Sequence, residues 1–102
     1  MKVKVNFLAV LRSLAKSNSV EVEAPQGSKV EDVIRLACMN NEALFKRVFE
    51  SSGEVRGDII VLVDGVDVNL LGGLSALIND VKEITLIPSV HGGAPSYESR
   101  NC

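Results

Sequence analysis

The chain has 102 residues, of which 46% are hydrophobic and 24% are charged, a balance that indicates one globular domain and excludes a wholly disordered chain. The formal net charge of −2 provides no basic excess of the kind that binds nucleic acids. The two cysteines and the single histidine are too few and too widely spaced for a disulfide framework or a zinc site, and no apolar run approaches the ~20 residues that span a membrane.

The first quarter of the chain predicts two strands. Residues 2–10 begin with alternating apolar and polar side chains, the pattern of a strand with one buried face. Residues 11–15 are expected to form a turn or a short helix. Residues 20–23 alternate again and are followed by Pro25 and Gly27, which end a strand. Two strands joined by a short link predict an antiparallel hairpin.

A capping box and an amphipathic pattern predict a helix after the hairpin. Ser28 and Glu31 are spaced so that the serine oxygen accepts from the N–H of residue 31 and the glutamate reaches back to the N–H of Ser28. The apolar residues that follow recur every three or four positions, as on the buried face of a helix: Val30, Val33, Ile34, Ala37 and Cys38. A second helical stretch over residues 43–49 ends before Gly53.

The second half of the chain predicts three more strands. Beyond Asp58, the residues up to Val63 are apolar at every position, which indicates a strand covered on both faces. A hairpin turn and a short return strand over residues 66–69 are expected next, because Asp-Gly is a hairpin signal. Residues 74–78 have apolar side chains spaced for one helical turn, and residues 81–87 form the last strand.

The order of these elements predicts an α+β domain in which a helix packs on one face of a mixed sheet. The predicted domain covers residues 1–88. Pro88 cannot donate to a strand ladder and is expected to end the pairing of the last strand. Small and polar residues follow from Ser89 onward, as in a mobile tail.

Three stretches, taken in order, resemble one family. They are residues 7–15 (Phe-Leu-Ala-Val-Leu-Arg-Ser-Leu-Ala), residues 63–68 (Val-Asp-Gly-Val-Asp-Val) and residues 81–93, which end in Gly-Gly. Here the chain resembles the small subunit of molybdopterin synthase, a ubiquitin-like sulfur carrier, and equally the relatives of the thiamin sulfur carrier and the archaeal ubiquitin-like small modifiers. The resemblance covers residues 2–93. It implies a β-grasp fold, with a mixed sheet of about five strands and a helix on one face.

The resemblance implies that Gly92 and Gly93 form the activated or conjugated terminus. An adenylating enzyme of the ubiquitin-activating type uses ATP and Mg²⁺ to join the terminal carboxylate to AMP. Sulfide then replaces AMP to give a thiocarboxylate, or a lysine amine attacks to give an isopeptide bond. The protein is the carried group in this chemistry, so the resemblance implies no bound cofactor, no metal and no catalytic residue of its own. Two residues without Cβ suit passage through a narrow channel.

The chain departs from the family because residues 94–102 follow Gly93. An internal Gly93 has an amide in place of the carboxylate, and an amide cannot be adenylated in this way. We therefore expect the encoded chain to be a precursor with a tail over residues 89–93 and an extension over residues 94–102. A protease is expected to cleave between Gly93 and Ala94. The alternative is an inert extension on a protein that only binds partners.

The last strand predicts a surface for enzyme partners beside the tail. If Ile84 and Leu86 point inward, alternation places Ile87 on the outer face. An exposed apolar patch marks an interface, and the family docks its enzymes in this region. The predicted partner-binding residues are those at the end of the strand and the start of the tail: Ile87, Pro88, Val90 and His91. His91 is also explained as a simple exposed tail residue.

Other residues have structural interpretations. Cys38 is expected to be a small core residue of the helix, and Cys102 to leave with the extension. Asp64 and Asp67 resemble a carboxylate pair but flank a predicted turn, which explains them better. Arg12 either pairs locally or contacts a partner. The expected location is the cytoplasm, where thiols stay reduced.

Three functions stay open on the sequence alone. The first is a sulfur carrier that donates sulfur from Gly93 in molybdenum cofactor biosynthesis, docked on the large subunit of molybdopterin synthase. The second is a ubiquitin-like modifier, processed after Gly93 and conjugated to lysines of target proteins. The third is an interaction module whose terminus is never activated.

Overall fold

In a computed structural model, residues 1–89 of the chain are described. They form strands, short helices and one 3₁₀ helix in the following order: β1 (Lys2–Phe7), α1 (Val10–Ala15), β2 (Ser19–Glu23), β3 (Ser28–Lys29), α2 (Val30–Cys38), α3 (Glu42–Val48), β4 (Ile59–Val63), β5 (Val66–Asp67), η1 (Val68–Leu71), β6 (Leu77–Ile78) and β7 (Glu83–Pro88).

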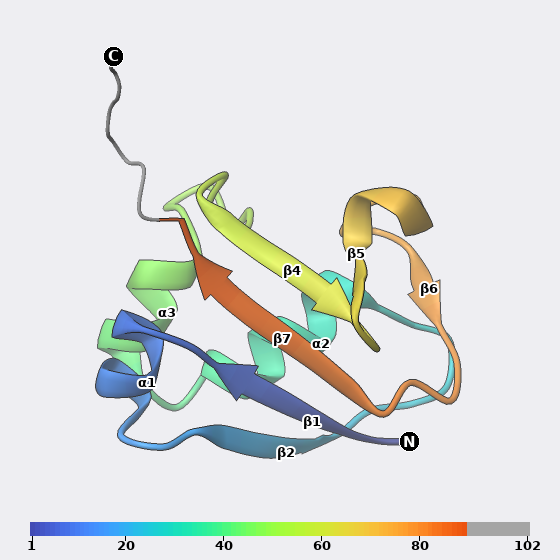
Figure 1. Cartoon of the computed structure of the whole chain (residues 1–102), viewed down its shortest axis with the longest axis horizontal. Helices are drawn as coiled ribbons and strands as arrows, with labels where there is room; N and C mark the ends of the chain where they lie inside the picture. Colours follow the sequence, from blue (N-terminus) through green and yellow to red (C-terminus); the bar gives the residue numbers. More distant parts are fainter. Residues whose placement is uncertain (90–102) are drawn as a thin grey trace.

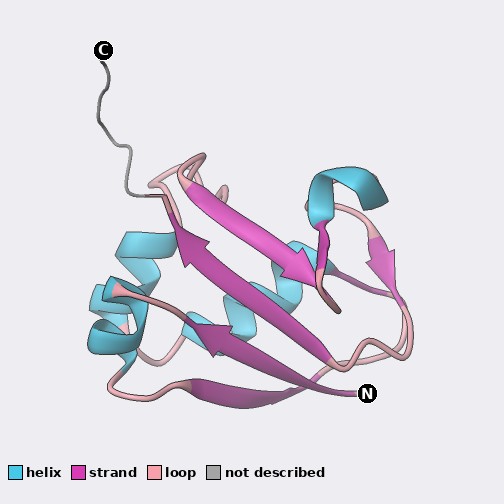
Figure 2. Cartoon of the chain, in the orientation of Figure 1, coloured by secondary structure: helices cyan, strands magenta, loops and turns pink. Residues whose placement is uncertain are grey.

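Five strands form one mixed sheet in the order β2-β1-β7-β4-β5. β1 and β7 are parallel, whereas the β1–β2, β4–β7 and β4–β5 pairs are antiparallel. In Figure 1, α2 lies behind the sheet and crosses its middle, with α1 and α3 at the left-hand end of the sheet, and Figure 2 shows the same elements by type of structure. This is the predicted β-grasp arrangement, including the β1–β2 hairpin, whose connection contains α1.

The core lies between the sheet and α2. The central strands contribute alternate side chains that are almost completely buried, as the period-two pattern predicted: Val3, Val5 and Phe7 of β1, and Ile84 and Leu86 of β7. From α2 the buried residues are Val30, Val33, Ile34 and Cys38, which confirms the helical face read from the sequence.

β4 differs from its prediction because only one of its faces is covered. Ile59, Val61 and Val63 are buried, but Ile60 is 43% exposed and Leu62 is half-buried. The expectation of cover on both faces was therefore wrong. α2 packs on one side of the sheet (Figure 1), and the exposed Ile60 and half-buried Leu62 belong to the opposite, open face.

The first turn of α2 is capped by a distant loop rather than by a capping box. The N–H groups of Val30 and Glu31 donate to the carbonyls of Ala76 and Leu74, at 3.1 and 3.0 Å. Lys29 occupies the N-cap position without a side-chain hydrogen bond, and the Ser28 hydroxyl donates to the carbonyl of Pro25 at 2.7 Å. The predicted capping box was wrong because the link from η1 to β6 supplies the acceptors.

That same link replaces the helical turn expected over residues 74–78. β6 instead pairs with β3 in a separate two-stranded sheet, where Ser28 lies opposite Ile78. This pairing holds the link against the start of α2, so that its carbonyls reach the helix N–H groups. A cap formed across more than forty residues of sequence leaves no local signal.

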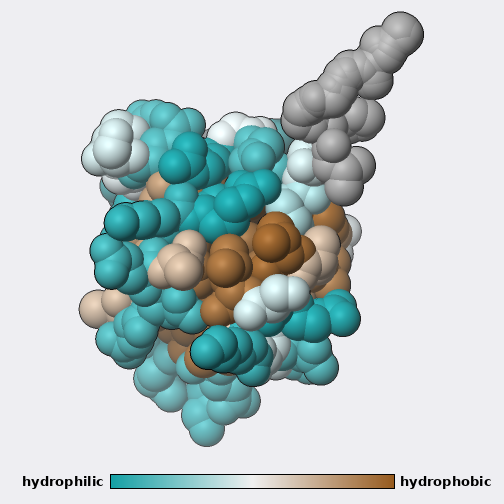
Figure 3. All heavy atoms as spheres, turned by 90° about the vertical axis from the view of Figure 1, so that its left-hand side faces the viewer, coloured by the Kyte–Doolittle hydropathy of each residue, from teal (hydrophilic) through white to brown (hydrophobic). Residues whose placement is uncertain are grey.

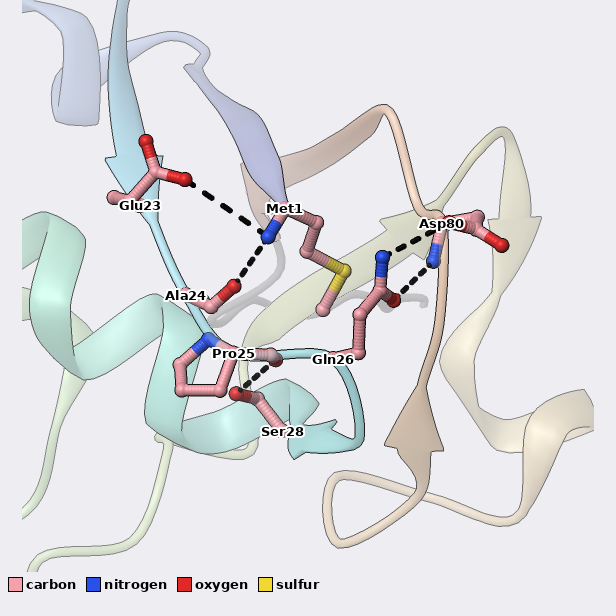
Figure 4. Close-up of polar contacts among 7 residues, drawn as sticks. All are labelled: Met1, Glu23, Ala24, Pro25, Gln26, Ser28 and Asp80. Atoms are coloured by element: carbon pink, nitrogen blue, oxygen red, sulfur yellow. Dashed lines mark hydrogen bonds and ion pairs between the residues drawn. The ribbon is translucent and has the colours of Figure 1, made fainter.

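Met1 is tied to the β2–β3 link, which in turn is tied to the β6–β7 link (Figure 4). The Met1 ammonium donates to the carbonyl of Ala24 at 2.6 Å and lies 3.9 Å from the carboxylate of Glu23. Gln26 and Asp80 bond reciprocally, because the Gln26 amide nitrogen donates to the Asp80 carboxylate at 2.9 Å and the Asp80 N–H donates back to the Gln26 oxygen at 2.8 Å. The N-terminus and the β2–β3 and β6–β7 links therefore meet at one edge of the domain.

The caps of the two main helices make different predictions for matched substitutions. Asn41 accepts from the N–H of Leu44 at 3.0 Å and donates to the carbonyl of Leu14 at 2.9 Å. Asn41→Ala should therefore lower the free energy of unfolding by about 1–2 kcal/mol. Ser28→Ala should cost about 0.5 kcal/mol or less, because Ser28 caps no helix. Urea unfolding of both variants checks this, and an equal or reversed order would contradict the assignment of the caps.

Cys38 predicts a pH dependence of stability. Burial raises the pKa of its thiol from 9.0 to about 12, so the folded protein keeps a proton that the unfolded chain loses above pH 9. Stability from this group is fully present below pH 9 and falls by about 1.4 kcal/mol for each pH unit from there up to about pH 12. The free energy of unfolding should be measured at pH 8 and 10.5 for chains ending at Gly93. It should fall less between these pH values in Cys38→Ala than in the unsubstituted chain. Equal losses would contradict the assignment.

Candidate functional site at the end of β7

β7 is the strand that leads out of the domain, and its two faces have different surroundings. Ile84 and Leu86 are fully buried against the helices, whereas Thr85 and Ile87 are half-buried on the other side. The predicted alternation of this strand is confirmed. Ile87 therefore lies on the open face, next to the place where the chain leaves the sheet.

β7 ends at Pro88, and one backbone hydrogen bond follows it. Glu83 accepts from the N–H of Asp64 at 2.9 Å, and Ser89 donates to the carbonyl of Asp58 at 2.7 Å, so the odd-numbered residues of β7 face β4. Pro88 faces the β1 side, where the last paired residue, Phe7, lies opposite Leu86. The missing N–H is tolerated there because no strand remains to accept it. The expectation that Pro88 ends the pairing is confirmed, because the last paired residues of β4 and β7 are Ile59 and Pro88. The bond from Ser89 to Asp58 lies one residue beyond both strands.

The predicted exposed patch also needs a correction at Pro88. Alternation places Pro88 on the same side as Ile84 and Leu86, and its side chain is buried. The side chain of Pro88 is therefore not exposed for the partner contact that the sequence predicted. Ile87 is the described residue of the predicted set that reaches the open face.

The open face carries an apolar stripe across three strands, formed by Leu8, Ile60, Leu62 and Ile87. Ile60 lies opposite Ile87 in the β4–β7 register. On the other side, Phe7 is beside Leu86, and the Leu8 N–H donates to the Leu86 carbonyl at 3.2 Å, so Leu8 continues β1 next to Ile87. Leu8 and Leu62 are half-buried. Figure 3 shows apolar surface at the end of the molecule where α1, α3 and the end of β7 lie.

The open face becomes polar toward the beginning of β7. The Asn6 amide donates to the Thr85 hydroxyl at 3.1 Å and to the Glu83 carboxylate at 3.3 Å. Lys4 lies beside Glu83 in the parallel register and is exposed. The apolar stripe is thus bounded by polar side chains on the side away from the exit of the chain, which is the composition of a docking surface with a polar rim.

An ion pair adjoins the exit of β7. Asp58, whose carbonyl accepts from Ser89, places its carboxylate against Arg47 of α3. The nitrogen–oxygen distances are 3.0 and 3.2 Å, with the two contacts on different carboxylate oxygens. The Arg47 and Asp58 side chains are 28% and 40% exposed. Sequence reasoning missed this pair because its members are eleven residues apart and on different elements.

The other nominated residues have structural roles. The carboxylate of Asp64 accepts from the N–H groups of Lys82 and Glu83 at 3.0 and 2.9 Å. The carboxylate of Asp67 accepts from the N–H of Asn69 at 2.9 Å. The interpretation as a local turn contact is confirmed for Asp67, whereas Asp64 lies in the turn but binds the distant start of β7. Arg12 is exposed on α1.

The predicted terminus lies outside the described residues. This applies to Val90, His91, Gly92, Gly93 and Ala94, and to Cys102. Within residues 1–89, no group of three His, Cys, Asp or Glu side chains could hold a metal ion, and no helix is long and apolar enough to cross a membrane. The site on this part of the chain is an apolar surface beside an anchored exit, which suits docking and presentation of a chain end.

Comparison with known proteins shows a family match over nearly the whole chain. The sequence pattern described as Urm1 (Ubiquitin related modifier) matches residues 2–93, so the match begins with β1 and stops at Gly93. The small archaeal modifier protein 3 of Haloferax volcanii is 28% identical over 93 residues, which cover 91% of this chain and all of that protein.

Two solved structures extend the similarity to the fold. The solution structure of small archaeal modifier protein 1 from Methanosarcina acetivorans has a TM-score of 0.77 at 33% identity, covering 90% of this chain and 96% of that one. A structure described as a putative molybdopterin converting factor, subunit 1, from Pyrococcus furiosus has a TM-score of 0.67 at 26% identity, covering 87% and 98%. The mixed five-stranded sheet, the apolar stripe beside the exit of β7 and the match that ends at Gly93 together place the chain in the ubiquitin-related modifier (Urm1) family of β-grasp small modifiers and sulfur carriers.

Proposed function

We propose that this protein is a carrier whose Gly93 carboxylate is activated by a ubiquitin-activating-type adenylating enzyme in the cytoplasm. The carboxylate attacks the α-phosphate of ATP and releases pyrophosphate, which leaves an acyl-adenylate at the terminus. Sulfide then displaces AMP and leaves a thiocarboxylate. The enzyme supplies ATP, Mg²⁺ and the groups that stabilise the charge on the phosphates. The observation that carries the proposal is the family match that ends at Gly93, four residues beyond an anchored Ser89.

The geometry of the exit supports presentation of this terminus to a buried site. Ser89 is held by Asp58, so the four residues from Val90 to Gly93 span up to about 14 Å when extended. The sequence predicted a tail over residues 89–93, and the hydrogen bond of Ser89 leaves residues 90–93 beyond the anchored part. A short arm brings the globular surface close to the enzyme, where the apolar stripe of Leu8, Ile60, Leu62 and Ile87 supplies the contact.

Sulfur donation is the first destination that we propose for the activated terminus. In this role the protein docks on the large subunit of molybdopterin synthase, and the thiocarboxylate gives its sulfur to a precursor of molybdopterin. The likeness to the structure described as a putative molybdopterin converting factor subunit supports it. The chain would supply the sulfur and the large subunit the substrate site.

Conjugation to target proteins is the second destination. A lysine amine of the target displaces AMP or sulfide and forms an isopeptide bond with Gly93. The similarity to the small archaeal modifier proteins favours this role, and so does the extension, since a precursor is the form in which ubiquitin itself is made. Both destinations require the same processed terminus, so one protein can serve both.

Processing at Gly93–Ala94 is expected to control activation. A chain of residues 1–93 should support exchange of pyrophosphate into ATP by the adenylating enzyme, whereas the chain of residues 1–102 should not, because its Gly93 has no carboxylate. Intact mass measurement on protein from its own cells should find the chain ending at Gly93 and a form in which one oxygen is replaced by sulfur. Pyrophosphate exchange by the full-length chain, or the sole presence of that chain beside its enzyme, would contradict processing.

The apolar stripe predicts a specific loss of enzyme binding. Ile60→Asp places a charge in the stripe at a side chain that is 43% exposed, so it should raise the Kd for the adenylating enzyme about tenfold or more without unfolding the domain. Ile87→Asp should act in the same direction. Titration calorimetry measures the affinity, and thermal unfolding monitors the fold.

A matched control comes from the opposite end of the sheet. Leu70 of η1 is 80% exposed, and η1 lies far from the exit of β7 in Figure 1. Leu70→Asp should leave the affinity unchanged. Equal affinities for Ile60→Asp and the unsubstituted chain would exclude the stripe as the docking surface.

A further inference from the structure

The two edges of the five-stranded sheet are built differently. β5 forms one edge and has only two residues, Val66 and Asp67, before the chain enters η1. β2 forms the other edge, and its five residues pair with β1 in one unbroken register. Very short strands, bulges and prolines keep an edge from pairing with another chain. β2 has none of these, and in Figure 1 no strand or helix of the described chain lies beyond it.

The hydrogen bonds of β2 leave two residues with unpaired backbone groups on its outer side. The Ala24 N–H donates to the Met1 carbonyl at 2.9 Å, and the Met1 ammonium donates back to the Ala24 carbonyl at 2.6 Å. Such hydrogen-bonded pairs alternate along an antiparallel ladder, so the two valines of β2 bond to β1. The N–H and carbonyl groups of Glu21 and Glu23 therefore point away from β1, and no hydrogen bond within residues 1–89 reaches them.

The side chains of β2 determine which strand fits this edge. Glu21 and Glu23 are exposed on one face, and Val20 is 39% exposed on the opposite face. Glu21 has no ion pair within residues 1–89. Opposite charges on neighbouring strands and apolar pairs both stabilise strand pairing. The edge therefore suits a strand in which Lys or Arg alternates with apolar residues.

β1 already shows that β2 pairs with a strand of this pattern. β1 begins Lys-Val-Lys-Val, and the register places Lys2 opposite Glu23 and Lys4 opposite Glu21, with valine opposite valine between them. An added strand of the same pattern continues the alternation of charge from β1 through β2. It also meets the backbone groups of β2 that β1 does not use.

A second copy of the chain fits this edge less well. Two β2 strands related by a twofold axis pair antiparallel. A register that joins the outward groups of Glu21 and Glu23 places glutamates opposite one another, which is destabilising. The shifted register brings Glu21 to Ser19, whose N–H and carbonyl already bond to the Ser17 hydroxyl at 3.4 and 2.8 Å. A basic strand from another protein meets neither obstacle.

We propose that the outer edge of β2 binds an extended segment of a partner protein in which Lys or Arg alternates with apolar residues, so that the segment adds a strand to the sheet. The backbone groups of Glu21 and Glu23 supply the hydrogen bonds, and their carboxylates attract the basic side chains. Val20 supplies the apolar contact. The site lies at the sheet edge and not on the apolar stripe, so it goes beyond the proposed activation at Gly93 and does not depend on it.

Amide hydrogen exchange of the full-length, ¹⁵N-labelled chain tests this edge with a defined peptide. The probe is the acetylated and amidated peptide Lys-Val-Lys-Val-Asn-Phe, which has the sequence of β1. At about 5 mM it should slow the exchange of the Glu21 and Glu23 N–H groups about threefold or more, through a Kd of about 1 mM. The Val20 and Val22 N–H groups, which already bond to β1, should keep their rates. The matched peptide Glu-Val-Glu-Val-Asn-Phe should protect neither glutamate.

Two substitutions separate the backbone contact from the charge. Glu21→Pro removes an outward N–H that β1 does not use, so it should abolish the protection of the Glu23 N–H by the peptide. Glu21→Gln keeps the N–H and should raise the Kd about threefold, and it decides the question if Glu21→Pro does not fold. Glu54→Gln is the matched control, because Glu54 is exposed in the link between α3 and β4. Thermal unfolding monitors the fold of each variant.

The outcomes divide as follows for the chain and its variants. Protection of both glutamates by the lysine peptide alone, lost or weakened in the Glu21 variants, would support the proposal. Equal protection by both peptides, effects confined to the apolar stripe, or unchanged exchange at Glu21 and Glu23 would overturn it. Protection that rises with protein concentration without peptide would make a second copy the occupant and would also contradict it. No adenylating enzyme takes part, so a failure of the proposed activation leaves this result unaffected.

Discussion

The parallel pairing of β1 and β7 is the constraint on which the rest of the domain depends. It brings Val5 beside Ile84 and Phe7 beside Leu86, so the first and last strands of the described chain form the centre of one sheet. Parallel neighbours need a crossover, and here nearly the whole chain lies between them. The helices that cover the buried face and the strands that extend the sheet are all part of this connection.

This central pairing also decides where the terminus leaves. A strand in the middle of a sheet has neighbours on both sides, so β7 ends beside both Leu8 and the start of β4. Its buried residues hold it in place, and its outward residues join those of β1 and β4 in a continuous surface. The proposed docking surface and the exit of the chain are therefore adjacent, because one strand forms both.

The sequence predicted the parts of the structure that repeat along the chain. Alternation in β1 and β7 and the three-and-four spacing in α2 identified the buried side chains, because each pattern reports the period of its own element. Whether a second face is covered depends on the neighbours, so the apolar run of β4 was read as a fully buried strand. The side of Pro88 depends on the register between strands, which no local pattern contains.

Contacts between distant segments were the other omission. The acceptors of the first α2 N–H groups come from the link before β6. The spacing of Ser28 and Glu31 matches a capping box, but the predicted cap does not form. In the candidate site, Ile87 was found by alternation alone, whereas Leu8 and Ile60 required the β1–β7 and β4–β7 registers. Arg47 and Asp58 have no motif, since ordinary surface residues become a pair only when α3 and β4 are packed.

The contact of the Met1 ammonium has a practical consequence for anyone who produces this protein. A tag fused ahead of Met1 converts the ammonium that bonds to Ala24 into an amide and removes its charge beside Glu23. A tag fused directly to Gly93 places an amide where the proposed activation requires a carboxylate, whereas a tag behind residue 102 would leave with the extension on the proposed cleavage. Material for quantitative measurements should therefore have a free Met1 ammonium and, for tests of the proposed activation, a free carboxylate at Gly93.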